Sequence, residues 1–417
     1  MSALPKLDIF SKQYTENPQS FFKPYREHSS VHYLEDHDLW IITRYDDVKK
    51  ALADPRFNRD RCHSKHASAQ GAGYFEKNTS PLNDNEHHRR SRLLVSKAFF
   101  PKRVERMQRL IDEVVGSHTQ NILKGGVVDL SKTVITPVPN KVISRIIGVP
   151  PDSEEQEQFL TSAMSVIVGM IDPDASDHAL AKAKDSHRYL FNYLAEEINK
   201  RKKNPQDDML SDFVDAAQSD PLCEDNDIIK LVLSLIAAGS ETTVHSSNLA
   251  ILNLYKNPQQ LKLLRDDRSL MSNAVMELLR FDDTGKLFRK YLTEDAEYGG
   301  KIIKKGESVY IVTASANHDP SAFPNPDVLD ITRCTKASMS FGFGPHYCVG
   351  VHLAKMEMVT LLNSILDNLP EQAAVLENQV RWDYDNSILR SITSLPVETG
   401  LPLAKRSSSQ LSEEPVS

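Results

Sequence analysis

The pattern of apolar and polar positions predicts a mainly helical chain with small sheets. Short alternating runs at 31–33 and 40–43 flank the turn-like residues 35–38, a pattern typical of a β-hairpin. Helical spacing then dominates. One helix is predicted from Pro101 to the glycine pair at 125–126, because proline suits the first turn of a helix and glycine suits its end.

The later segments show the same alternation of long helices and short strands. A capping box at 153–156 predicts a helix that runs to about Ile171. Residues 225–257 are apolar on almost every side until a polar group at 239–243, so this helix is expected to cross the core. Residues 301–313 alternate around a turn and predict a second hairpin, and helical spacing returns at 351–369.

The length of 417 residues would allow two or three domains, and a content of 40% hydrophobic residues can fill a large core. No linker rich in proline, glycine or serine interrupts residues 9–401. We therefore expect one large domain over residues 9–403, with an N-terminal tail over 1–8. Residues 404–417 lack aromatic residues and apolar periodicity, so we expect this C-terminal tail to be disordered.

Charge and cysteine usage narrow the class of protein. The net charge of -7 argues against a general nucleic-acid or anionic-membrane binder. The four cysteines lie far apart without a C-x-x-C pair, which excludes a disulfide scaffold and the usual zinc knuckles. The first residues have no apolar core of a signal peptide, and the longest apolar stretch, 231–239, is shorter than the ~20 residues that span a bilayer. We therefore expect a cytoplasmic protein in a reducing compartment.

The segment with the clearest chemistry is F-G-F-G-P-H-Y-C-V-G at 341–350, followed at once by a helix. Its glycines allow backbone amides to turn toward the sulfur of Cys348, and the start of the next helix adds positive potential. That environment favours a thiolate, which acts as a nucleophile or as a soft metal ligand. These physical arguments alone leave an equal alternative, in which the loop is a turn or an anion site and Cys348 is a small buried apolar residue.

The spacing F-G-x-G-x-H-x-C-x-G resembles the haem-binding loop of the cytochrome P450 haem-thiolate enzymes, with every specified position matched. The resemblance implies the P450 fold as a single large haem-binding domain of the soluble bacterial type. It implies haem b (iron protoporphyrin IX) with Cys348 as the axial thiolate on the iron, which favours O–O cleavage. Phe341 would shield the sulfur, His346 would hydrogen-bond a haem propionate, and Gly350 would lie against the haem.

The polar group in the apolar helix forms a second motif, A-G-S-E-T-T at 238–243. A threonine inside a helix can bond back to a carbonyl one turn earlier, which bends the helix and opens a groove. Taken alone, such a segment is in most cases explained by helix packing around its glycine, here Gly239. Together with Cys348 it resembles the family's oxygen-activating motif, which implies that Thr242 hydrogen-bonds dioxygen, that Glu241 relays protons, and that Ala238 leaves room over the haem.

Glu277 and Arg280 form an i,i+3 pair, which alone would be an exposed ion pair of small energetic value. The pair resembles the family's E-x-x-R, and Arg333 stands where the partnering arginine belongs. The resemblance assigns all three a structural role. They would hold the loop that presents Cys348, so loss of Glu277 or Arg280 is expected to abolish haem incorporation.

Two further segments are candidates for binding the haem propionates. His88 and Arg92 are four residues apart and share a helix face, so both could reach one anion, although a solvated basic helix end is the plainer interpretation. They match the family's H-x-x-x-R. The second propionate position, five residues before Asp295, holds Lys290, and Arg289 is its neighbour; a one-residue bulge would bring the Arg289 guanidinium in instead.

The chain also departs from the family pattern. The stretch 281–286, which normally lines the substrate pocket, lacks the usual proline and is polar, with Lys286, which hints at an unusual substrate. No phosphate-binding G-x-x-x-x-G-K or dinucleotide-binding G-x-G-x-x-G after a strand is present, so electrons must come from another protein. By resemblance the donor is a ferredoxin or flavodoxin with its reductase, and its docking charges would be Lys97, Lys102, Arg103, Arg106 and Lys355.

The sequence therefore predicts a monomeric monooxygenase of secondary metabolism that uses dioxygen to hydroxylate or epoxidise a small or medium organic molecule. A peroxide-driven or oxidative-coupling enzyme is the alternative within the same fold. A non-catalytic haem sensor is a weaker alternative, because a sensor has little need for the acid–alcohol pair Glu241–Thr242.

Overall fold

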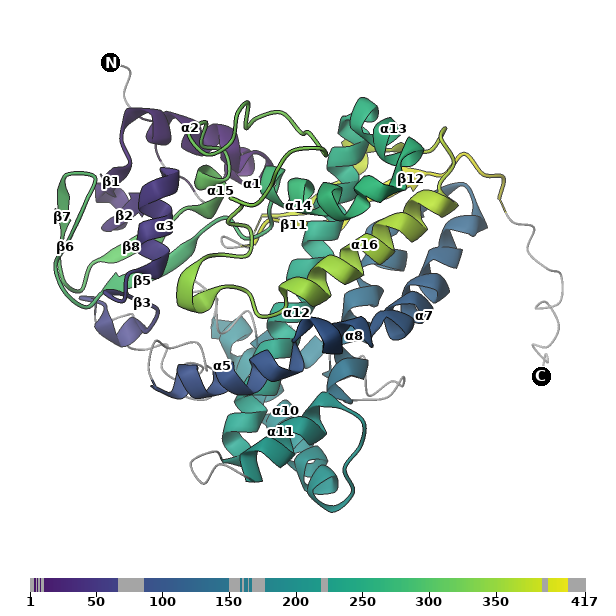
Figure 1. Cartoon of the computed structure of the whole chain (residues 1–417), viewed down its shortest axis with the longest axis horizontal. Helices are drawn as coiled ribbons and strands as arrows, with labels where there is room; N and C mark the ends of the chain where they lie inside the picture. Colours follow the sequence, from purple (N-terminus) through teal and green to yellow (C-terminus); the bar gives the residue numbers. More distant parts are fainter. Residues whose placement is uncertain are drawn as a thin grey trace, which may run out of the picture.

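The computed structural model describes residues 4, 6, 8, 11–66, 86–149, 158–159, 161–163, 165–166, 177–218, 224–384 and 389–403. This part of the chain is mainly helical with small sheets, as predicted, and Figure 1 shows the larger sheet at one side of the helical body. Residues 404–417, predicted to be disordered, lie outside the described residues, as does most of the helix predicted from 153 to 171.

The helices follow one another along nearly the whole described chain. They are α1 (Lys12–Glu16), α2 (Pro18–His28), α3 (Tyr45–Ala53), α5 (Glu86–Ala98), α6 (Pro101–Glu105), α7 (Gln108–Thr119), α8 (Pro137–Ile147), α10 (Asp177–Lys203), α11 (Met209–Gln218), α12 (Asp225–Lys256), α13 (Pro258–Asp266), α14 (Met271–Phe281), α15 (Thr313–Ala316) and α16 (Val351–Asn368).

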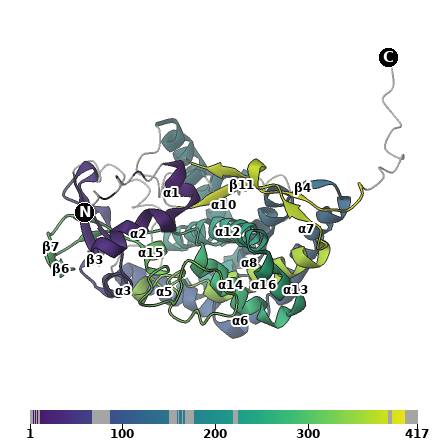
Figure 2. The ribbon, with the colours of Figure 1, turned by 90° about the horizontal axis from the view of Figure 1, so that it is seen from above.

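Helix α12 crosses the middle of the molecule, as its apolar pattern predicts (Figure 2). Its residues join those of α7, α8, α14 and α16 in the main hydrophobic core. Contact with α8 is close at Gly239, where an added Cβ would lie 3.2 Å from Ile143 Cδ1. Among the described helices, α12 alone has the length and apolar composition of a membrane span. In its apolar 18-residue stretch, 59% is buried inside the protein.

The strands form four small sheets. The five-stranded sheet has the order β1 (Val31–Leu34), β2 (Leu39–Ile42), β8 (Ser308–Ile311), β5 (Phe288–Leu292) and β3 (Phe57–Asn58). The smaller sheets are β4 (Val127–Asp129), β12 (Pro396–Glu398) and β9 (Ala374–Val375); β10 (Arg381–Asp383) and β11 (Ser391–Ser394); and β6 (Ala296–Tyr298) and β7 (Lys301–Ile303).

The first predicted hairpin is confirmed and the second is wrong. Strands β1 and β2 pair antiparallel from Val31–Ile42 to Leu34–Leu39. Strand β7, however, pairs with the preceding β6, whereas β8 runs parallel to β2 and antiparallel to β5. The reason is burial, since all four residues of β8 are buried and take a central place in the larger sheet, while Ile302 of β7 is 57% exposed.

The single helix predicted from Pro101 is divided into α6, α7 and a 3-10 turn over Gln120–Lys124. The division after α6 follows from i→i−3 bonds, in which the amides of Arg106 and Met107 reach the carbonyls of Arg103 and Val104 and tighten the chain. The predicted end is confirmed, because Gly125 adopts a positive φ of 73° directly after the turn.

Candidate active site

The loop that carries Cys348 is shaped by two glycines. Gly342 and Gly344 have φ values of 73° and 75°, and a Cβ added at Gly344 would lie 3.0 Å from the carbonyl oxygen of Leu52. The amide of Cys348 donates to the carbonyl of Phe341 at 2.9 Å and closes the loop, and α16 begins three residues later. The loop therefore sets the Cys348 sulfur just before a helix N-terminus.

The sulfur of Cys348 lies in a mixed electrostatic environment. Burial raises the pKa of the Cys348 thiol, and the Asp283 carboxylate adds to that increase. The backbone amide of Gly350 and the Arg92 guanidinium act in the opposite direction and lower the pKa. A cation at this position would convert such a thiol into a thiolate, so the sulfur suits a soft metal ion.

Helix α5 places the predicted propionate residues beside this loop. His88 is buried, and its ring stacks on the ring of His346 with centroids 4.4 Å apart. Arg92, one turn later, donates to the carbonyl of Tyr347, and burial lowers the pKa of its guanidinium while Cys348 raises it. The structure thus brings His88, Arg92, His346 and Cys348 together, from segments about 250 residues apart.

The polar turn of α12 carries the predicted acid–alcohol pair. Thr242 Oγ1 donates to the carbonyl of Ala238 at 2.6 Å, which confirms the predicted bond back to the preceding turn. Ala238 itself is exposed although it lies in the middle of a core helix. Burial raises the pKa of Glu241 to about 7, with a smaller contribution from Asp383. Glu241 is therefore a carboxyl group that gains and loses a proton near neutral pH.

The predicted Glu277–Arg280–Arg333 network is present and buried. Arg280 donates to both carboxylate oxygens of Glu277, from Nε at 2.7 Å and from Nη2 at 2.8 Å, while Arg333 Nε donates to Oε1 at 3.0 Å. Glu277 is 0% exposed and Arg280 is 1% exposed. The pair is thus a core element, and not the exposed helix pair that its spacing alone would suggest.

Asn317 connects this network to the Cys348 loop, a role that the sequence analysis did not identify. Arg280 Nη1 donates to the carbonyl of Asn317 at 2.8 Å. The side chain of Asn317 accepts from the amide of Met339 at 2.8 Å and donates to Ser340 Oγ at 3.1 Å, directly before Phe341. An asparagine before His-Asp-Pro has no period or spacing that would predict this contact.

Strand β5 separates the two candidates for the second propionate position. Its pairing with β8 is regular from Phe288 to Tyr291, without the bulge that would move Arg289. The guanidinium of Arg289 lies 5.5 Å from the ring centroid of Tyr291, and Phe288 Cζ lies 3.9 Å from a Cβ built at Gly342. Because side chains alternate along a strand, Lys290 shares the face of Phe288, toward the Cys348 loop, and Arg289 lies on the other face.

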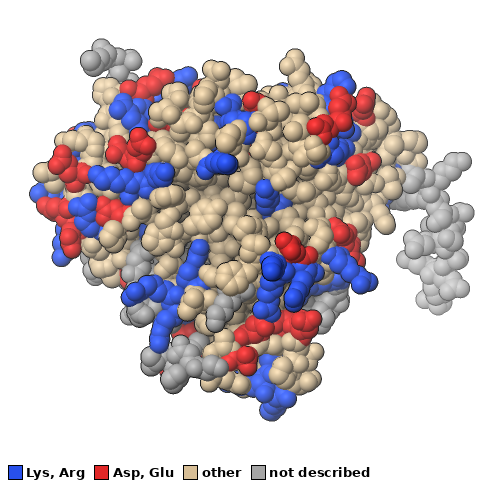
Figure 3. Space-filling view, viewed as in Figure 1, with Lys and Arg blue, Asp and Glu red and all other residues tan. Residues whose placement is uncertain are grey.

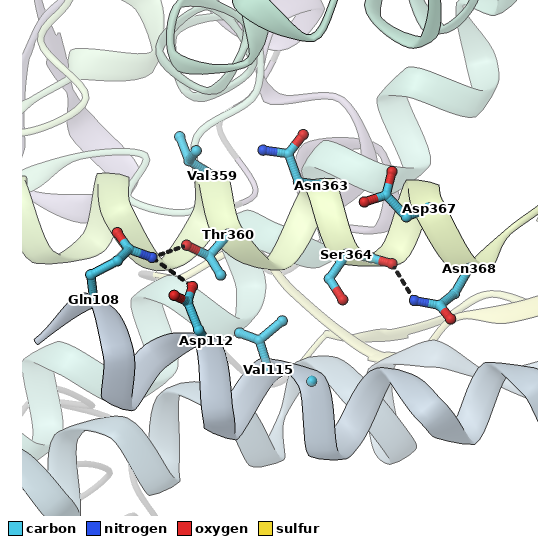
Figure 4. A pocket seen from close by; sticks show the side chains of 10 residues that line it. Gln108, Asp112, Val115, Val359, Thr360, Asn363, Ser364, Asp367 and Asn368 are labelled. Atoms are coloured by element: carbon cyan, nitrogen blue, oxygen red, sulfur yellow. Dashed lines mark hydrogen bonds between the residues drawn. The ribbon is translucent and has the colours of Figure 1, made fainter.

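Helix α16 is supported by α7 where a polar hollow lies between them (Figure 4). Gln108 on α7 donates to Asp112 at 2.7 Å and to Thr360 of α16 at 3.0 Å. Asn368 donates to the carbonyl of Ser364 at 2.8 Å, in the last turn of α16. The hollow therefore belongs to the contact that positions the helix after Cys348.

Comparison with known proteins identifies the family. The cytochrome P450 family model matches residues 3–373. The polyketide biosynthesis cytochrome P450 PksS of Bacillus subtilis (strain 168) is 30% identical over 93% of this chain and 96% of its own length. The vitamin D(3) 25-hydroxylase of Pseudonocardia autotrophica is 30% identical over 94% of this chain and 96% of its own length.

A solved structure shares the fold and the length. The crystal structure of P450BioI in complex with hexadec-9Z-enoic acid ligated acyl carrier protein has a TM-score of 0.84 and 30% identity, and the match covers 92% of this chain and 98% of that one. The fold, the loop around Cys348 and the near full-length relatives agree. The chain therefore belongs to the cytochrome P450 family and is an oxidoreductase of the monooxygenase class.

Proposed function

We propose that the chain binds haem b through Cys348 and inserts one atom of dioxygen into an organic molecule of secondary metabolism. The haem, when bound, supplies the activation of dioxygen, and the protein supplies the ligand, the protons and the pocket. The observation that carries this proposal is the Cys348 loop, whose sulfur lies just before a helix N-terminus and within electrostatic range of Arg92 on α5. The relatives named above, which act in polyketide biosynthesis and as a hydroxylase by their names, support it.

The residues around the loop fit a haem with its two propionates. Gly350 would leave space beside the sulfur, since a Cβ there would lie 4.0 Å from Cys348 Sγ. The exposed Ala238 on α12 would face the ring, and Phe341, which packs against the core, would shield the sulfur. Arg92, His88 and His346 would hold one propionate, because α5 and the Cys348 loop bring these three side chains together. Lys290 would hold the other propionate, because it shares the face of β5 that is directed toward the loop.

Glu241 and Thr242 would deliver protons on the α12 side. With a pKa of about 7, the Glu241 carboxyl is present in both its protonated and its ionised form near neutral pH. The protonated form can donate a proton, and the ionised form can take up another proton from solvent. The Thr242 hydroxyl, held by the Ala238 carbonyl, has a fixed oxygen position from which it can pass a proton on. An acid and an alcohol in consecutive positions thus form a short relay.

The electron donor would dock on the face in front of the Cys348 loop. Figure 3 shows lysines and arginines over the lower middle of this face, where Figure 1 draws α5 and the start of α7. Lys102 and Arg106 are exposed, and Phe100 beside them is 59% exposed, a combination typical of a transient interface. Arg103 pairs with Asp212, so we assign it a structural role, and the side chain of Lys97 lies outside the described residues.

The proposal is tested with the purified full-length chain and a Cys348→Ser variant. We expect the wild type to contain about one haem per chain and to show the long-wavelength carbon monoxide band of a thiolate-ligated ferrous haem. The variant should lose that band. With a ferredoxin or flavodoxin and its reductase, label from oxygen-18 gas should enter the product. A normal thiolate band in Cys348→Ser, or label that comes from water, would refute the proposal.

A further inference from the structure

Lys286 is a buried lysine that has no carboxylate partner among the described residues, and burial lowers its pKa to about 7. Its side chain is 0% exposed, and its Nζ has no hydrogen-bond partner among the residues that the structure describes. Its ammonium instead lies 4.4 Å from the centroid of the Tyr14 ring. By contrast, the buried Arg280 pairs with Glu277, and the buried Arg390 pairs with Asp282. An unpaired buried ammonium is costly, so its presence requires an explanation.

Lys286 lies two residues before the residue of β5 that contacts the Cys348 loop. Its carbonyl accepts from the amide of Ala314 at 3.1 Å, which anchors the chain just before β5. Two residues later, Phe288 Cζ lies 3.9 Å from a Cβ built at Gly342 in that loop. Two extended residues span at most about 7 Å, so the Cα atom of Lys286 lies within about 7 Å of the Cα atom of Phe288.

Lys286 and Glu241, in the relay turn of α12, share one charged neighbour, Asp383. Burial lowers the pKa of Lys286 to about 7 and raises the pKa of Glu241 to about 7. The Asp383 carboxylate adds a smaller increase to each pKa, so Asp383 is within electrostatic range of both side chains. Gly285, the preceding residue, bridges to Leu389, next to the β10–β11 pair that carries Asp383. Lys286 is therefore joined through β5 to the residue that contacts the loop, and through Gly285 to the strands that carry Asp383.

The charges around Lys286 favour one kind of ligand. A single ammonium balances one negative charge, and a second negative charge on the same ligand would be repelled by Asp383, which already acts on Lys286. The ring against the Lys286 ammonium, Tyr14, is aromatic and 0% exposed. The matching ligand is a monoanion with an apolar body, and the common group of that charge in organic metabolites is a carboxylate.

We propose that Lys286 selects substrates with a free carboxylate, by pairing its ammonium with that group while the apolar body extends toward the reacting centre. This inference rests on the proposed function and names the substrate class for that same site. It makes Lys286 a specificity residue whose partner is the substrate and not another residue of the chain.

The test compares acids with their amides, which have nearly the same shape but no charge. The ligands are three matched pairs of acid and amide: octanoate and octanamide, dodecanoate and dodecanamide, and hexadecanoate and hexadecanamide. Each is added to the haem-loaded full chain. Affinity is measured by equilibrium dialysis and by the spin-state change in the optical spectrum. The proteins are wild type, Lys286→Met, and Lys262→Met, which removes an exposed lysine of α13 as a control for net charge.

We expect the wild type and Lys262→Met to bind at least one acid roughly 10- to 100-fold more tightly than its amide, the range of a hydrogen bond to a buried charge. Lys286→Met should lose this preference and keep its affinity for the amide. Equal affinity for acid and amide throughout the series, a preference retained by Lys286→Met, or binding confined to acyl chains on a carrier protein would each overturn the inference. Loss of the thiolate carbon monoxide band in wild type would instead refute the proposed function, so the two failures are distinguishable.

Discussion

Replacing Glu277 with glutamine tests whether the buried network holds the haem-binding loop. The carboxylate of Glu277 accepts two bonds from Arg280 and one from Arg333, and it also accepts the amide of Asp330 at 3.1 Å. Glutamine keeps the shape of the side chain but removes its charge. It also presents an NH₂ group to at least one guanidinium that already donates.

The magnitude follows from the burial of the partners. Removing one member of a buried ion pair costs about 3–5 kcal/mol, because the remaining charge stays buried without compensation. Whole proteins are stable by about 5–15 kcal/mol, so Glu277→Gln should remove a large share of the total. The destabilisation should extend to the Cys348 loop. Arg280 donates a hydrogen bond to the carbonyl of Asn317, and the side chain of Asn317 is hydrogen-bonded to Met339 and Ser340 directly before the loop.

The assay combines urea denaturation, followed by circular dichroism, with haem content per chain in freshly purified protein. We expect Glu277→Gln to unfold at a clearly lower urea concentration and to contain little haem. The control is Lys262→Ala, whose exposed i,i+4 pair with Asp266 should leave both measurements unchanged. Full haem content together with an unchanged denaturation midpoint in Glu277→Gln would refute the argument.

Three further predictions concern catalysis and electron transfer. Thr242→Ala should lose most turnover driven by dioxygen and a reductase but keep most turnover driven by added peroxide, and equal losses in both assays would contradict the relay. In wild type, the amount of product formed per electron should fall as the pH rises through about 7. The raised pKa of Glu241 means that its carboxyl holds a proton below that pH and loses it above. The Glu241→Gln variant should turn over slowly, and its product yield per electron should show no inflection near pH 7. Arg106→Glu should slow reduction by a ferredoxin and weaken its dependence on salt, and an unchanged rate at low and high salt would remove the exposed Arg106 from the docking face.

Local features of this protein were predictable from the sequence. The glycines at 342 and 344, the cysteine between them and α16, and the apolar run that becomes α12 each act within about ten residues. Backbone sterics and the two side-chain periods decide such features, and both are properties of adjacent residues. The first hairpin and the bond from Thr242 to the Ala238 carbonyl belong to the same class.

Other features depended on which distant segments became neighbours. The predicted hairpin at 301–313 failed because β8 is buried between β2 and β5, and no local pattern names those partners. The assignment of Lys290 and Arg289 to opposite faces required the register of β5 against β8. Asn317 gained its role in the same way, from contacts with residues 37 positions before it and 22 after it.

The sequence by itself determined the motif chemistry, the core helix and the class of fold, because each of these depends on residue type and short spacing. The tertiary structure decided the burial of Glu277 and Arg280, which makes an ordinary i,i+3 pair a core element. It also decided the burial of Lys286, whose Nζ has no hydrogen-bond partner in the described part of the chain. The burial of a side chain and the identity of its partners depend on every segment that packs around it, including segments far away in the sequence. They therefore emerge only when the entire chain has folded around it.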